Sequence, residues 1–180
     1  MPAILLIMGA NALGIIGAVA LESTPAFADG TAQAPIDPDL LELWSHMFEP
    51  RDLEAEIEWR VEHWRKLNGR VIPFDAEEFR ALERRIIAHA GRHDNPGAHA
   101  RADYSALTRG AEVVHVTVPT LVIATPEDPT NPASNSRHLA ANLPPSTLVT
   151  IDRMGHAIPR AVVPPLSEVI LNHLKAVEAE

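Results

Sequence analysis

The sequence predicts an α/β fold that is built on a parallel β-sheet. Two apolar segments, residues 118–124 and 148–151, have the pattern of strands, a helical segment over 135–143 joins them, and a final helix follows from Pro164. An order of strand, helix, strand and helix is typical of a right-handed parallel unit. Residues 111–180 are therefore expected to form one part of the core, and the helical patterning ahead of them indicates a separate layer.

The first 35 residues are expected to add a strand, a loop and a helix to the same core. Ile4–Met8 is a short aliphatic run that ends at Gly9, which is typical of a buried parallel strand followed by a tight loop. Residues 14–21 are small and apolar, and we expect them to form a helix that packs closely on the sheet. The Pro, Ala, Gly and Asp content of residues 24–38 favours a loop.

Residues 36–110 are expected to form a helical cap. Apolar residues recur at helical spacing over 40–48 and over 53–67, where Asn68-Gly69 ends the second run. Asp75 is suited to cap a third helix, with Glu78 at the capping-box position. A short fourth helix is expected over 97–105. The aromatic side chains of this region are expected to pack the cap helices together, and some of them could instead face a substrate cavity: Trp44, Phe48, Trp59, Trp64 and Phe79.

Composition limits the classes of partner. A chain of 180 residues that is 46% hydrophobic suits one packed domain. The formal net charge is -9 and the basic residues are scattered among acids, so nucleic acid is not expected as a partner. The chain has no cysteine, which excludes disulfides, thiolate nucleophiles and zinc sites of the cysteine type. We expect a cytoplasmic protein.

The apolar run at residues 3–21 leaves an alternative open. It carries no charged side chain, and Ala26-Phe27-Ala28 resembles a small-residue cleavage site, so residues 1–28 could serve as an export signal or an anchor. Against this, no Lys or Arg precedes Arg51, and glycines interrupt the run. A membrane is therefore not expected as a partner.

Two strand ends place an acid and a histidine at one edge of the predicted sheet. Asp128 follows the strand at 118–124, and His156 follows the strand at 148–151. An acid that orients an imidazole, and a histidine that takes a proton from a nucleophile, are two members of a catalytic triad. Each also has a simpler explanation, as a turn residue and as a loop histidine. Their order and spacing favour the triad, with Glu127 as a less favoured alternative acid.

A second polar cluster contains His89, His93, Asp94, His99 and Asp103. The first two histidines would share one helical face, but no Glu follows His89 as in the metalloprotease pattern, and the glycine and proline beyond it end the helix. Histidines at a helix C-terminus are explained by their interaction with the helix dipole. We expect no metal and no cofactor.

Four segments carry a resemblance to a known family: Val118-Pro-Thr-Leu-Val-Ile, Pro126-Glu-Asp128-Pro-Thr-Asn-Pro132, Arg137-His-Leu-Ala-Ala-Asn-Leu-Pro and Arg153-Met-Gly-His156-Ala-Ile-Pro. They resemble the α/β-hydrolase superfamily, in its capped, esterase-like branch, from about residue 38 to the C-terminus. The resemblance implies a partial α/β-hydrolase parallel sheet with a helical cap. It also implies that the acid and the histidine of a Ser-His-Asp centre are Asp128 and His156.

The same resemblance implies a role for the loop after the first strand. In this family, backbone N–H groups of that loop help to build an oxyanion hole, and the matching residues here are Gly9, Ala10 and Asn11. Two alternatives remain for this segment. Either a deletion joins the early strand to the helix that normally comes after the nucleophile, or residues 9–14 are a degraded nucleophile turn with Asn11 at the nucleophile position.

The sequence lacks the family's Gly-x-Ser-x-Gly motif, which places a serine nucleophile on a sharp turn between a strand and a helix. Seven serines occur, and none has glycines at the required spacing: Ser23, Ser45, Ser105, Ser134, Ser136, Ser146 and Ser167. We therefore expect a family member that by descent is an ester hydrolase and that is truncated or inactive as it stands. The alternative is a non-catalytic module that binds a small apolar, ester-like molecule or depends on a partner, such as a second copy that completes the sheet.

Overall fold

The computed structural model describes residues 17–22, 35–94 and 114–179. Several expectations concern residues outside these ranges, namely the strand at 4–8, the oxyanion loop with Gly9, Ala10 and Asn11, and the short helix at 97–105. Most of the apolar run at 3–21 also lies outside them. Within the described residues, no helix is long and apolar enough to cross a membrane.

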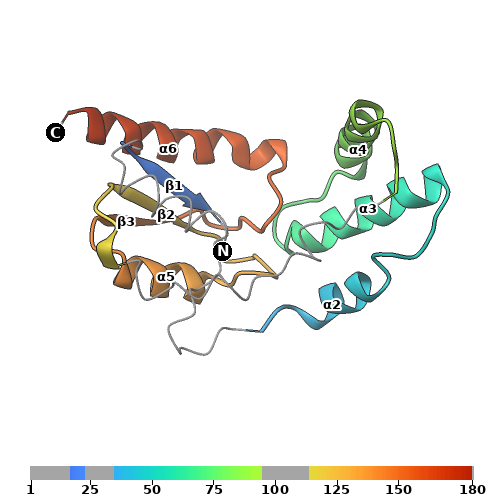
Figure 1. Cartoon of the computed structure of the whole chain (residues 1–180), viewed down its shortest axis with the longest axis horizontal. Helices are drawn as coiled ribbons and strands as arrows, with labels where there is room; N and C mark the ends of the chain where they lie inside the picture. The colour runs from blue at the N-terminus through green and yellow to red at the C-terminus, as the bar shows by residue number, and fades with distance from the viewer. Residues whose placement is uncertain (1–16, 23–34, 95–113, 180) are drawn as a thin grey trace.

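A parallel sheet forms the centre of the core (Figure 1). Its described strands are β1 (Val19–Glu22), β2 (Thr120–Ala124) and β3 (Ser146–Thr150), in the order β1-β2-β3. Strand β2 pairs with both neighbours, and every one of its residues is buried. This explains its uninterrupted apolar sequence, because a strand of a parallel sheet that is covered on both faces has no solvent side.

Strand β1 corrects the prediction of a helix over residues 14–21. Val19, Ala20 and Leu21 lie in a strand that pairs with β2, with Val19 opposite Thr120. Short apolar residues are compatible with either structure, and pairing with a buried strand outweighs a weak local preference. Residues 19–22 thus belong to the same core, as expected for the first 35 residues, but they join it as a strand beside β2.

The described α-helices lie where the sequence predicts helices, whereas the 3-10 helix was not predicted. They are α2 (Pro38–Ser45), α3 (Leu53–Leu67), α4 (Ala76–Ala90), α5 (Ala133–Asn142), the 3-10 helix η3 (Arg160–Val162) and α6 (Val163–Glu178).

Helices α5 and α6 lie on opposite sides of the sheet (Figure 1). On the α5 side, Leu139 packs in a cluster with Val122 of β2. On the α6 side, Leu166 and Ile170 pack against a cluster that contains Leu121. Successive residues of β2 supply the two clusters because neighbouring side chains of a strand point to opposite faces.

Helices α2, α3 and α4 form the cap, which stands beside the sheet (Figure 1). One buried cluster joins Leu40 of α2, Ile57 of α3 and Phe79 of α4, and Trp44 and Trp64 pack against it. The expected packing of these aromatic residues is therefore confirmed.

Two details of the cap differ from the predictions. Phe48 is 53% exposed, because α2 ends at Ser45 and its buried face does not continue to residue 48. Asp75 caps α4 as predicted and accepts hydrogen bonds from the N–H groups of Glu77 and Glu78. However, the carboxylate of Glu78 accepts a hydrogen bond from the N–H of Arg160 at 3.0 Å, so it links the cap to the core.

Candidate active site

Asp128 lies in the turn that follows β2, and its side chain has no solvent exposure. Oxygen Oδ1 accepts hydrogen bonds from the main-chain N–H groups of Thr130 at 2.7 Å and Asn131 at 2.9 Å. An aspartate that binds the backbone two residues ahead stabilises a tight turn. The same bonds fix the carboxylate at the C-terminal edge of the sheet, so the turn explanation of this residue is confirmed, and its position is also compatible with the triad explanation.

His156 lies in the loop that follows β3, and its side chain is 35% exposed. Its Nδ1 atom is 3.2 Å from Oδ2 of Asp128 and 2.9 Å from the hydroxyl oxygen of Thr130. The structure thus brings the predicted acid and histidine into hydrogen-bond contact, at the upper end of the expected range.

The hydroxyl of Thr130 bears on the tautomer of His156. A hydroxyl donates one hydrogen bond and can accept two. Thr130 donates to Oδ1 of Asp128 at 2.7 Å and accepts from the side-chain amide of Asn131 at 3.0 Å. Its remaining acceptor site faces Nδ1 of His156, and the other neighbour of Nδ1 is a carboxylate oxygen. A carboxylate oxygen can only accept, so these contacts favour the tautomer with the proton on Nδ1 and the lone pair on Nε2.

An arrangement of this kind suits a general base. A lone pair on Nε2 can take a proton from a nucleophile, and the buried carboxylate of Asp128 then stabilises the imidazolium that forms. Thr130 was not identified from the sequence. The only available signal was a hydroxyl residue two positions after the acid, which is too common to indicate a role.

Glu127, the alternative acid, is directed elsewhere. Its carboxylate oxygen Oε2 accepts a hydrogen bond from the main-chain N–H of Arg70 at 3.2 Å, and its own N–H donates to the carbonyl of Met154 at 3.0 Å. It therefore connects three segments and leaves Asp128 as the acid beside the histidine.

A second histidine, His63 on α3, interacts electrostatically with His156. Its Nε2 accepts a hydrogen bond from the indole N–H of Trp44 at 2.9 Å, and its ring lies among those of Trp44, Trp59 and Trp64. Burial, and to a lesser degree the charge of His156, lower the pKa of His63 to about 4. His63 is therefore neutral near pH 7, and the cap places no second cation beside His156 from this position.

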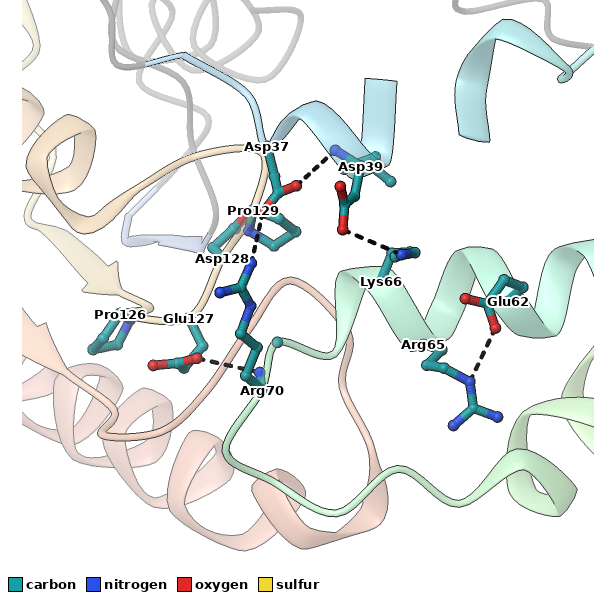
Figure 2. A pocket seen from close by; sticks show the side chains of 12 residues that line it. Asp37, Asp39, Glu62, Arg65, Lys66, Arg70, Pro126, Glu127, Asp128 and Pro129 are labelled. Carbon is teal, nitrogen blue, oxygen red and sulfur yellow. Dashed lines mark hydrogen bonds and ion pairs between the residues drawn. The ribbon is translucent and has the colours of Figure 1, made fainter. Parts of the chain in front are cut away.

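A cleft of about 500 Å³ runs along the outer side of the acid turn, between the start of α2 and the end of α3 (Figure 2). Charged side chains line much of it and pair with one another: Arg65 with Glu62 at 3.0 Å, Lys66 with Asp39 at 3.6 Å, and Arg70 with Asp37 at 3.3 Å. Because the side chain of Asp128 is buried, the cleft meets its turn from outside. The paired charges make this cleft a polar boundary between cap and core. It therefore differs from the apolar pocket that would favour binding of an ester.

The predicted polar cluster around His89 is only partly described. Asp94 pairs with Arg92, and the carbonyl of His93 accepts a hydrogen bond from Arg60 at 2.8 Å. His99 and Asp103 lie outside the described residues. In the part of the chain that the structure describes, no group of three His, Asp or Glu side chains is placed to hold a metal ion.

The hydroxyls of three serines bind main-chain carbonyl groups. Ser45 donates to Glu42 at 2.7 Å, and Ser146 donates to Ala140 at 2.9 Å. Ser136 is buried in α5 and donates to the carbonyl of Ile123 at 3.4 Å. Ser23 and Ser105 lie outside the described residues. These three hydroxyls serve the fold.

Comparison with proteins of known sequence finds relatives among hydrolases, although no family model matches the chain. The chain is 42% identical over 137 residues to rhodomycin D methylesterase DnrP of Streptomyces peucetius, which covers 76% of this chain and 46% of DnrP. It is 43% identical over 123 residues to rhodomycin D methylesterase DauP of Streptomyces sp. (strain C5), which covers 68% of this chain and 41% of DauP. The chain thus spans less than half the length of these two relatives.

Solved structures show the same fold. The structure of 2-hydroxy-6-oxo-6-phenylhexa-2,4-dienoate hydrolase from Rhodococcus sp. strain RHA1 matches with a TM-score of 0.64 at 18% identity, and the match covers 96% of this chain and 59% of that one. A bromoperoxidase from Bacillus anthracis matches with a TM-score of 0.63 at 17% identity, and the match covers 94% of this chain and 63% of that one. At these identities the likeness shows the fold alone.

Proposed function

Because this chain belongs to the esterase-like branch of the α/β-hydrolase superfamily, we propose that it carries the acid and the general base of an ester hydrolase. One observation supports this most strongly. Nδ1 of His156 lies between the oxygens of Asp128 and Thr130, which favours a basic lone pair on Nε2. The names of the two sequence relatives favour a carboxylic methyl ester as the substrate class.

The chain alone is proposed to be inactive toward esters. An oriented histidine cannot attack a carbonyl unless a nucleophile is present, and loss of the serine of such a triad removes roughly a millionfold of rate. The sequence contains no Gly-x-Ser-x-Gly motif to supply that serine.

The first test is hydrolysis of p-nitrophenyl acetate and butyrate by the purified chain and by a His156→Ala control. We expect equal, slow rates, because surface histidines give the same background in both proteins. A burst of nitrophenol together with an acyl-serine detected by mass spectrometry would contradict the proposed inactivity.

The second test supplies the missing component. A chimera is made by replacing the portion of DnrP that this chain matches with the corresponding 137 residues of this chain. We expect the chimera to hydrolyse a carboxylic methyl ester, and His156→Ala or Asp128→Asn to abolish that activity. A chimera that remains fully active with His156→Ala would contradict the role assigned to His156.

A further inference from the structure

The C-terminal end of α3 contacts both turns of the proposed acid–base pair. The main-chain carbonyl of Leu67 accepts hydrogen bonds from the N–H of His156 at 2.8 Å and the N–H of Ala157 at 3.1 Å. The last carbonyls of a helix have no partner within it, so the loop of the histidine satisfies a group that α3 leaves open. Ala157 is also buried in the hydrophobic cluster of the cap.

Gly155 allows the loop of His156 to lie this close to the end of α3, because glycine has no Cβ atom. A Cβ atom at residue 155 would lie 2.5 Å from the carbonyl oxygen of Asn68 and 2.7 Å from that of Leu67. Both obstacles are main-chain atoms, which cannot rotate away as the end of a side chain can. Any larger residue at 155 would therefore separate the loop of His156 from α3.

Gly69 makes the corresponding contact with the turn of the acid. A Cβ atom at residue 69 would lie 2.5 Å from Cβ of Glu127 and 2.9 Å from its carbonyl oxygen. The φ angle of Gly69 is +77°, which also favours glycine. Beside it, the N–H of Arg70 donates to the carboxylate of Glu127, as Figure 2 shows. Residues 67–70 thus lie against residue 127 on one side and residues 155–157 on the other.

We propose that residues 67–70 are a positioning element that sets the separation of Asp128 and His156, with Gly69 and Gly155 as the positioning residues. Each of the two turns extends from a different strand, β2 or β3, and the end of α3 connects them. The N–H of Glu127, which donates to Met154, adds one direct link between the turns. This role rests on the proposed function, and it implies that the end of α3 cannot move away from the core without loosening the acid–base pair.

The test observes the imidazole of His156 by ¹H–¹⁵N NMR in four glycine variants of the full chain. Gly155→Ala and Gly69→Ala are expected to cause loss or an upfield shift of the hydrogen-bonded Nδ1 proton signal. Gly91→Ala is the matched control for Gly69→Ala, since Gly91 has a φ of +67° but its Cβ position has no neighbour within 4 Å among the described residues. Gly17→Ala, with an equally open Cβ position, is the control for Gly155→Ala. Both controls are expected to keep the wild-type signal.

A variant without steric conflict keeps the test decisive if Gly155→Ala or Gly69→Ala does not fold. Glu127→Ala removes the acceptor for Arg70 N–H and is expected to broaden the same proton signal through faster exchange. The positioning role would be overturned if the His156 signal were unchanged in Glu127→Ala and in whichever of Gly155→Ala and Gly69→Ala folds. A wild-type protein that lacks an Nδ1 proton signal would instead contradict the proposed function, so the two failures can be told apart.

Discussion

Thr130 completes the hydrogen bonding of the site, because its hydroxyl contacts both the carboxylate of Asp128 and Nδ1 of His156. We expect Thr130→Val to lower the free energy of unfolding by about 1 to 2 kcal/mol, since one hydrogen bond to a carboxylate is lost while the main-chain donors to Asp128 remain. Urea denaturation measures the change, and Thr130→Ser, which keeps the hydroxyl, should stay near wild type. A loss of stability in Thr130→Ser with none in Thr130→Val would show that the methyl group matters and the hydroxyl does not.

His63 makes stability depend on pH. Its pKa is about 4 in the folded state, below the ordinary value of 6.5, so between these values the unfolded state binds a proton that the folded state does not. The contribution of His63 to the free energy of unfolding is constant above pH 6.5, and it becomes unfavourable to folding as the pH falls through 6.5 toward 4. We expect a loss of about 2 to 3 kcal/mol across that window.

The measurement compares wild type with His63→Gln, which does not titrate and can still accept from Trp44. All other titratable groups are the same in both proteins. The difference between their free energies of unfolding, followed against pH, therefore isolates the contribution of His63. A difference that does not change with pH would show that His63 is protonated normally in the folded state.

At the scale of helices, a buried ion-pair group holds α3 to α4. Arg60 binds Glu56 at 2.7 Å and Glu83 at 3.1 Å, and both glutamates are buried. Burial acts to lower the pKa of Arg60, but its hydrogen bonds to the two glutamates outweigh burial and raise it. Glu83 also accepts from the indole N–H of Trp64 at 2.7 Å.

We expect Arg60→Met to lower the free energy of unfolding by about 3 to 5 kcal/mol, because it leaves the buried carboxylate of Glu83 without its cation, while Glu56 keeps Arg51 at 3.5 Å. Thermal and urea unfolding measure the loss. The control is Arg80→Met, which removes an exposed pair between the same two helices and should change stability little. Similar small effects for both variants would mean that the buried group contributes no more than a surface pair.

The elements show what the sequence could predict. Helix α3 begins and ends where the apolar period and Asn68-Gly69 indicated, and α4 begins after its predicted cap at Asp75, because these signals are local. Strand β1 was predicted as a helix, since its identity depends on pairing with β2 across the fold. The proximity of Asp128 and His156 could be predicted from two strand ends, whereas the roles of Thr130 and Leu67 depend on how distant turns pack.

At the scale of the whole molecule, β1 is expected to be essential to the core. Leu21 is 7% exposed and packs in the cluster beneath α5, and β1 covers one edge of β2. Deletion of residues 1–22 would expose that edge, and we expect an insoluble or molten product without a cooperative thermal transition. A deletion variant that stays monomeric and melts like wild type would show that this segment is not part of the fold, and would favour the export alternative.

A cytoplasmic location and association of two copies remain predictions.

The most direct test of the account is the tautomer of His156, measured by long-range ¹H–¹⁵N correlation at about pH 8, where an ordinary histidine is neutral. We predict a proton on Nδ1 and an unprotonated Nε2, because both neighbours of Nδ1, Asp128 and Thr130, present acceptors. Asp128→Asn should weaken this preference, since the amide replaces a charged acceptor. A wild-type His156 with its proton on Nε2, unaffected by Asp128→Asn, would contradict the claim that this chain holds the oriented base of an ester hydrolase.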